Sequence, residues 1–146
     1  MSYKTIISEK DLKNNIDNKD FIIFDSRCDI KDRGYGIDSY TDGHIPNSIF
    51  VDVDTDLASE KQQGTGRHPL PKVETFCDKL SHWGMDNNKQ AVIYDDAGGA
   101  FAGRMWWMLK WLGHENVAVL DGGLNSWVKN GNKLVTSPTL FQKSYF

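Results

Sequence analysis

The sequence predicts an α/β fold, in which a five-stranded, mainly parallel sheet is covered by helices on both faces. Five short apolar segments are separated by segments whose apolar residues recur at helical spacing. Two of these apolar segments, residues 21–24 and 91–94, are unbroken, which is typical of strands buried on both faces. Because strands that alternate with helices form parallel sheets with right-handed crossovers, this order of elements predicts a single layered domain.

The first half of the chain is expected to contain three strands and one helix. Residues 4–7 are β-prone, and residues 8–11 resemble a capping box that begins a helix through Leu12 and Ile16. The strand at 21–24 follows. The third strand, residues 48–51, comes after Pro46, which favours an extended conformation in the residue before it. Residues 54–71 have few apolar side chains and several Gly and Pro, so we expect a long irregular loop.

The second half is expected to alternate three helices with two strands. Positions 73, 76, 77 and 80 form one apolar face of a helix over 72–82, which Gly84 ends. The strand at 91–94 leads through a small-residue loop into a helix over 101–112, which Gly113 ends. The last strand is residues 117–120, and a final helix follows Gly123. Residues 133–146 show no clear period.

Composition limits the possible functions. The chain has 146 residues, which suits one domain, and its net charge of −3 does not indicate a nucleic-acid-binding surface. No apolar run approaches the roughly 20 residues of a membrane span, and residues 1–4 lack the apolar segment of a secretory signal. Its two cysteines form neither a zinc site nor a disulfide framework. We therefore expect a cytoplasmic protein with free thiols, without cofactor or metal, that binds neither membrane nor nucleic acid.

Three segments in this order resemble the signatures of the rhodanese-like domain. They are Asp-Ser-Arg at 25–27, Gly-His-Ile-Pro-Asn-Ser at 43–48 and Asp-Gly-Gly-Leu-Asn-Ser-Trp at 121–127. Residues 64–71 and 104–109 narrow the resemblance to the N-terminal half of tandem thiosulfate or 3-mercaptopyruvate sulfurtransferases. The resemblance implies a rhodanese-like domain over residues 1–136 and the start of an interdomain linker at 137–146.

The resemblance also implies which residue is missing. The family moves sulfane sulfur from thiosulfate or 3-mercaptopyruvate to cyanide or a thiol, through a persulfide on a Cys that directly follows the fourth strand. Such a Cys needs an activated thiolate. Here Asp95 stands at the matching position, and a carboxylate cannot carry sulfane sulfur. We expect this chain to be inactive alone, and its parent protein to be a sulfurtransferase. The implied partners are a Cys-bearing C-terminal rhodanese domain and a small anionic sulfur donor.

The acidic pair Asp95-Asp96 has two interpretations from the residues alone. Two carboxylates after a strand can hold Mg²⁺, but the further acidic and Lys partners of such sites are not found in the sequence. We favour the interpretation that the pair caps the following loop and helix.

The two cysteines are weak candidates for chemistry. Cys77 lies on the apolar face of a predicted helix and is expected to be a core residue. Cys28 lies near the carboxyl end of a strand, where ligands bind in parallel sheets. The interval from Cys28 to Arg33 is one residue shorter than the Cys loop of a phosphatase, and Asp29 and Asp32 would repel phosphate.

His68 and Asp54 are the candidate accessory catalytic residues. In mercaptopyruvate sulfurtransferases the first half is thought to lend an Asp and a His to a Ser of the second half, and these two residues match. A His oriented by a carboxylate can tune a hydroxyl in a partner domain. The alternative is that Arg67 and His68 only fix the loop or a domain interface.

Several other side chains carry expectations that a structure can test. Arg27 is expected to pair with Asp25, and His44 with the backbone near its turn. Arg104 is expected to offset the charge of Asp95 or to point toward another domain. His114 is expected to be a solvated helix end.

Two functions therefore remain open. The first is the non-catalytic half of a sulfurtransferase, which shapes the cleft of a second domain. The second is a stand-alone, inactive rhodanese-like module that binds a partner or an anion. The tryptophans bear on both: Trp107 and Trp111 share a helix face, which leaves Trp106 for solvent, a loop or a partner.

Overall fold

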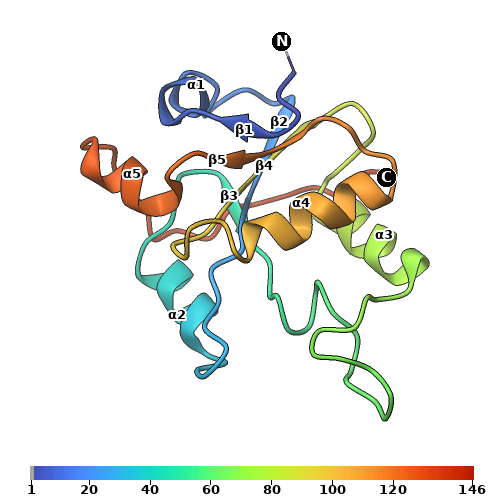
Figure 1. Cartoon of the computed structure of the whole chain (residues 1–146). Coiled ribbons are helices and arrows are strands. Elements are labelled where there is room, and N and C mark those ends of the chain that lie inside the picture. Colours follow the sequence, from blue (N-terminus) through green and yellow to red (C-terminus); the bar gives the residue numbers. More distant parts are fainter. Residues whose placement is uncertain (1) are drawn as a thin grey trace.

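The computed structural model describes residues 2–146. Strands and helices alternate along the whole chain (Figure 1). The strands are β1 (Ile6–Ile7), β2 (Phe21–Asp25), β3 (Ser48–Phe50), β4 (Gln90–Tyr94) and β5 (Val117–Leu120). The helices are α1 (Glu9–Asn14), α2 (Tyr35–Asp42), α3 (Val73–His82), α4 (Ala102–Trp111) and α5 (Gly123–Lys129).

The five strands form one parallel sheet in the order β1-β5-β4-β2-β3. The predicted fold class is therefore confirmed. Strand β4 is central and buried along its whole length. Its register places Tyr94 beside Asp25, the last residue of β2. Since parallel strands end at the same edge, the segments that follow β2 and β4 meet there, at the place where such sheets carry their sites.

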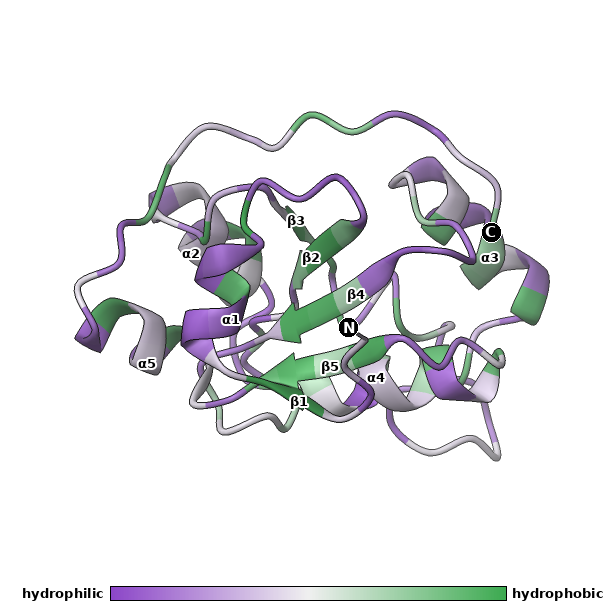
Figure 2. Ribbon diagram, turned by 90° about the horizontal axis from the view of Figure 1, so that it is seen from above, coloured by the Kyte–Doolittle hydropathy of each residue, from purple (hydrophilic) through white to green (hydrophobic). Residues whose placement is uncertain are grey.

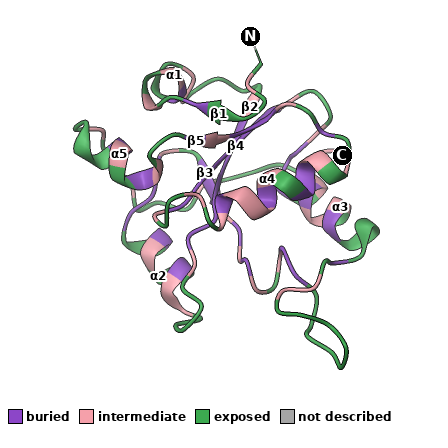
Figure 3. Ribbon diagram, in the orientation of Figure 1, coloured by how far each residue is buried: buried purple, intermediate pink, exposed green. Residues whose placement is uncertain are grey.

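Each face of the sheet has its own apolar core (Figures 2 and 3). Helices α3 and α4 cover one face, where Phe76 and Met105 pack among the side chains of β2 and β4. Helices α1 and α5 cover the other face with Leu12 and Trp127. Successive residues of β4 alternate between the two cores, which is the reason why the strand is apolar throughout.

The predicted start of α1 is confirmed, but helix α2 was not predicted. The Ser8 hydroxyl accepts a hydrogen bond from the backbone of Asp11, as in the capping interaction that the sequence indicates. Helix α2 buries only Gly36 and Tyr40, so its sequence has no apolar periodicity. A Cβ at Gly36 would lie 2.3 Å from the carbonyl oxygen of Arg27, and glycine is therefore required where this helix meets the end of β2.

The tryptophans of α4 are oriented differently from the prediction. Trp106 packs against the core, and its indole donates hydrogen bonds to the carbonyls of Lys4 and Val117, both at 3.1 Å. Trp107 and Trp111 are the exposed pair, stacked with ring centroids 5.9 Å apart. Trp106 is thus half-buried under β5 and the N-terminal segment, and the expectation that the Trp107–Trp111 face packs inward instead was wrong.

The C-terminal segment lies back against the domain. Val135 and His44 exchange two backbone hydrogen bonds of 2.9 Å, and Phe146 donates its backbone N–H to the Ser81 hydroxyl at 3.0 Å. Residues 137–146 thus contact α3 in this chain; their expected role as the start of a linker stays a prediction. No helix within residues 2–146 is long and apolar enough to cross a membrane.

Candidate functional site

A buried polar network lies where β2 and β4 end. Arg27 donates to both carboxylate oxygens of Asp25, with a shortest distance of 2.7 Å, and the Tyr94 hydroxyl donates to Asp25 at 2.9 Å. Burial lowers the pKa of Arg27, but the hydrogen bond and charge of Asp25 outweigh it, so the pKa is raised and Arg27 stays a cation. The guanidinium also donates to the carbonyl of Gly43 at 2.7 Å. The predicted Arg27–Asp25 pair is confirmed, and it fixes this edge of the sheet.

The loop after β4 wraps around the carboxylate of Asp95, which is buried. One carboxylate oxygen accepts the backbone N–H groups of Ala97 and Gly99 at 3.0 and 2.9 Å, and the other accepts those of Phe101 and Ala102 at 2.9 Å. Inward-pointing amides of this kind form an anion-binding nest. We call the segment from Asp95 to Ala102 the amide cradle. Its anion is a side chain of the protein itself, which confirms the capping interpretation of Asp95.

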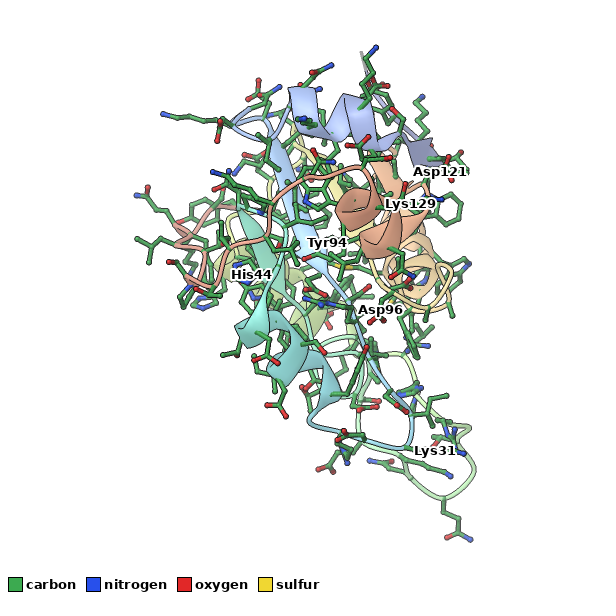
Figure 4. All side chains as sticks on the ribbon, turned by 90° about the vertical axis from the view of Figure 1, so that its left-hand side faces the viewer. Lys31, His44, Tyr94, Asp96, Asp121 and Lys129 are labelled. Carbon is green, nitrogen blue, oxygen red and sulfur yellow. The ribbon has the colours of Figure 1, made fainter. Side chains whose placement is uncertain are left out.

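Asp96 behaves differently from Asp95. Its carboxylate accepts a hydrogen bond from the Tyr35 hydroxyl of α2, and it is only half-buried. Figure 4 labels Tyr94 and Asp96, which flank Asp95 in the sequence, with His44 on a neighbouring ribbon and Lys129 on helix α5. Within residues 2–146, no group of three or more His, Cys, Asp and Glu side chains could hold a metal ion. Asp95 thus caps the loop and the start of α4, whereas Asp96 bonds a side chain of α2, so the capping interpretation was wrong for Asp96.

His68 and Asp54 come together beside the long loop. The Nε2 atom of His68 lies 2.6 Å from Asp54 Oδ1, and Arg33 Nε lies 3.8 Å from the other carboxylate oxygen. The side chains of His68 and Asp54 are 18% and 21% exposed, so solvent reaches both. The backbone of His68 is left-handed, with φ of 54°, which a residue other than glycine adopts only where its surroundings hold it.

This pair lines an open hollow of about 960 Å³. Most charged side chains around it are basic: Arg33, Lys61, Arg67, Lys72 and Lys79, against Asp54 and Glu60. Lys79 is already paired, because it donates to Asp56 at 3.1 Å and to the carbonyl of Thr55 at 2.7 Å. The remaining excess of positive charge suits a small anion.

Arg104, in the first turns of α4, reaches the same loop. It donates to the carbonyl of Leu57 from Nε at 3.1 Å and from Nη2 at 2.7 Å, and to the carbonyl of His68 from Nη2 at 2.7 Å. The expectation that it offsets the charge of Asp95 was wrong: the amide cradle already satisfies that carboxylate, and the guanidinium turns to the loop carbonyls.

Comparison with known proteins agrees with these observations. The rhodanese-like domain family matches residues 8–130, which is most of the chain. The chain belongs to the rhodanese-like domain family.

Among the curated relatives of this rhodanese-like domain is a probable 3-mercaptopyruvate sulfurtransferase of Pseudomonas aeruginosa. It is 37% identical over 148 residues, which cover 100% of the chain and 52% of the relative. The 3-mercaptopyruvate sulfurtransferase of Escherichia coli K12 is 33% identical over 122 residues, covering 82% of the chain and 42% of the relative. The chain spans about half the length, or less, of these curated relatives.

Solved structures show the same likeness. The 3-mercaptopyruvate sulfurtransferase from Leishmania major superposes with a TM-score of 0.86 at 29% identity, over 98% of this chain and 40% of that one. The 3-mercaptopyruvate sulfotransferase SseA from Escherichia coli gives 0.85 at 28% identity, over 99% of this chain and 56% of that one. The rhodanese-like domain described here therefore matches about half of each structure.

Neither cysteine of this rhodanese-like domain offers a thiolate at neutral pH. Burial, followed by the charges of Asp54, Asp52 and Asp29, raises the pKa of Cys28 to about 11. The pKa of Cys77 is also raised, chiefly by burial. Cys77 is half-buried rather than a full core residue, because α3 turns only Phe76 and Leu80 completely inward. Reactive cysteines have lowered pKa values, and both of these thiols have raised ones.

Two other histidines have structural contacts. His44 is buried and hydrogen-bonds the carbonyls of Tyr40 and Ser137, as expected for a backbone-bound turn residue. The expectation of a solvated His114 was wrong: it is buried, its Nε2 lies 2.9 Å from the carbonyl oxygen of Lys89, and burial lowers its pKa.

Proposed function

We propose that this chain is the non-catalytic half of a sulfurtransferase that moves sulfane sulfur from 3-mercaptopyruvate or thiosulfate to cyanide or a thiol. The names of its relatives support this reaction class, and the share of their length beyond the match supports a second domain. That second domain would carry the catalytic Cys, and this chain would form one wall of its cleft. Cys28 and Cys77 are both free thiols, which supports a cytoplasmic location.

The observation that carries the proposal is the occupied amide cradle. A persulfide needs a sulfur atom, held as a thiolate and stabilised by backbone amides. Asp95 presents oxygen instead, and its carboxylate uses four of the loop N–H groups. The chain therefore has the stabilising half of a persulfide site without the atom that would carry sulfur.

The His68–Asp54 pair gives the chain its proposed part in the reaction. Asp54 holds Nε2 of His68, and the structure gives no hydrogen bond to Nδ1 within residues 2–146. A His held in this way can exchange a proton with a hydroxyl that a partner domain presents. The basic side chains of the hollow, such as Arg67 and Lys72, would attract the anionic donor.

The proposal can be tested with a chimera, in which this chain replaces the matching half of the Pseudomonas aeruginosa relative. We expect the chimera to transfer sulfur from 3-mercaptopyruvate and the 146-residue chain to give no turnover. In the chimera, H68A should lower kcat/KM about a hundredfold, a loss typical of removing a group that transfers protons. H82A is the matched control, since His82 contacts Phe141 on the far end of α3. Unchanged activity of H68A would contradict the role of the pair.

A second function, an inactive stand-alone module that binds an anion, is favoured by the basic hollow alone. This second function predicts that the 146-residue chain binds thiosulfate and that a chimera containing the chain shows no sulfur transfer. Both functions allow the chain to bind thiosulfate, so the chimera assay separates them. Sulfur transfer by the chimera supports the first function, and a folded chimera without sulfur transfer supports the second.

A further inference from the structure

Arg104 is a partly buried cation held by carbonyl groups. Its hydrogen bonds run to the backbone of Leu57 and His68, and burial lowers its pKa. No carboxylate within residues 2–146 forms an ion pair with it. Removing a cation from water without a charged partner is unfavourable unless other polar groups replace the water. The carbonyls of Leu57 and His68 replace it here, so Arg104 and these carbonyls hold one another in place.

One of these carbonyls belongs to the left-handed residue of the long loop. His68 has φ of 54°, and it is anchored from two sides. Arg104 binds its backbone oxygen at 2.7 Å, and Asp54 binds its ring at 2.6 Å. A strained backbone persists only where its surroundings define it, and such strain gathers at functional positions. The two contacts together determine where the imidazole lies in the hollow.

The position of Arg104 depends in turn on the amide cradle. Asp95 binds the backbone N–H groups of Phe101 and Ala102, where α4 begins. Arg104 lies within the first turn after these residues, so the carboxylate sets the start of the helix that carries the guanidinium. A continuous path of hydrogen bonds thus leads from Asp95 through α4 and Arg104 to His68.

The loop has other attachments that do not reach His68. Ser59 donates its backbone N–H to the carbonyl of Pro69 at 2.9 Å, which closes the base of the loop. Lys79 holds the carbonyl of Thr55 at 2.7 Å from α3. Loss of the Arg104 contacts would therefore leave the loop attached at Pro69, while the His68 carbonyl loses its hydrogen-bond donor.

We propose that Arg104 is a positioning residue for His68, and that Asp95, at the place of the family's cysteine, anchors this positioning path. The importance of the path for sulfur transfer rests on the proposed function; the geometric statement does not. Asp95 thereby has a structural role. The amide cradle fixes the start of α4, and Arg104 of α4 fixes the His68–Asp54 pair.

The test is NMR of the imidazole N–H that His68 donates to Asp54, in the 146-residue chain. In the R104M variant, which keeps side-chain length and loses the donors, we expect this proton to exchange with water about tenfold faster, as for one lost charge-assisted hydrogen bond. R104K, which can still bind a carbonyl, should fall between R104M and the unaltered chain. Unchanged exchange in R104M would overturn the proposal.

Two controls keep the result interpretable. The ring protons of His44, which bonds Tyr40 and Ser137 far from the loop, report whether a variant is folded. Should R104M not fold, R104K decides alone, and exchange equal to that of the unaltered chain overturns the proposal. Failure of the proposed function would appear separately, as turnover by the isolated chain, and leaves the exchange result intact.

Discussion

Replacing Asp95 by alanine tests how much the amide cradle contributes to stability. D95A removes four hydrogen bonds from backbone N–H groups to a buried carboxylate. A hydrogen bond contributes about 1 kcal/mol net, and those to charged groups contribute more. Water that enters the emptied site recovers part of the loss. We therefore expect D95A to lower the free energy of unfolding by about 3 kcal/mol, a large fraction of the roughly 5–15 kcal/mol that holds a domain together.

The assay is urea unfolding, with D96A as the matched control. Asp96 is half-buried and bonded to the Tyr35 hydroxyl, so D96A should cost about 1 kcal/mol or less. Sulfate should stabilise D95A more than the unaltered chain, because an anion can enter the vacated amides and binding to the folded state adds stability. Equal stabilities of D95A and D96A, or equal responses to sulfate, would refute the argument.

Three further predictions follow from the same geometry. In D95C with Cys28 and Cys77 replaced by serine, the amide cradle should lower the pKa of the new thiol below about 8.5. The pH dependence of alkylation measures this pKa, and an ordinary or raised value would contradict an amide cradle that stabilises anions. In the unaltered chain, alkylation of Cys28 should follow a pKa of about 11, and D54N should lower it by removing a nearby negative charge. Burial lowers the folded-state pKa of His114. Its stabilising contribution is therefore complete above the unfolded-state pKa of about 6.5 and is lost as the pH falls below that value. H114Q should flatten this dependence of the free energy of unfolding on pH, and an unchanged slope would contradict the prediction.

Much of the fold could be predicted because it depends on local patterns. The unbroken apolar runs identify β2 and β4, and the capping sequence at Ser8 identifies α1. Helix α2 could not be found, since it buries only two residues and its key contact is that of Gly36 with the distant backbone of Arg27. The partial burial of Trp106 depends on its contacts with two distant segments. Patterns within a segment do not contain such contacts.

The candidate site shows the same division. Asp95 was identifiable because the strand, the small-residue loop and the helix are adjacent in sequence. The match of His68 with Asp54 came from family resemblance, because nothing in the intervening loop indicates that the two meet. The carbonyls bound by Arg104 lie 36 and 47 positions away in sequence, so its role could be read only from the folded chain.

The central claim is that the place of a sulfur-carrying thiol is filled by the Asp95 carboxylate. The most direct measurement is the intact mass of the 146-residue chain after incubation with thiosulfate whose sulfane sulfur is labelled, beside the complete Escherichia coli relative. We expect an unchanged mass for this chain. One labelled sulfur bound per molecule of the chain would contradict it.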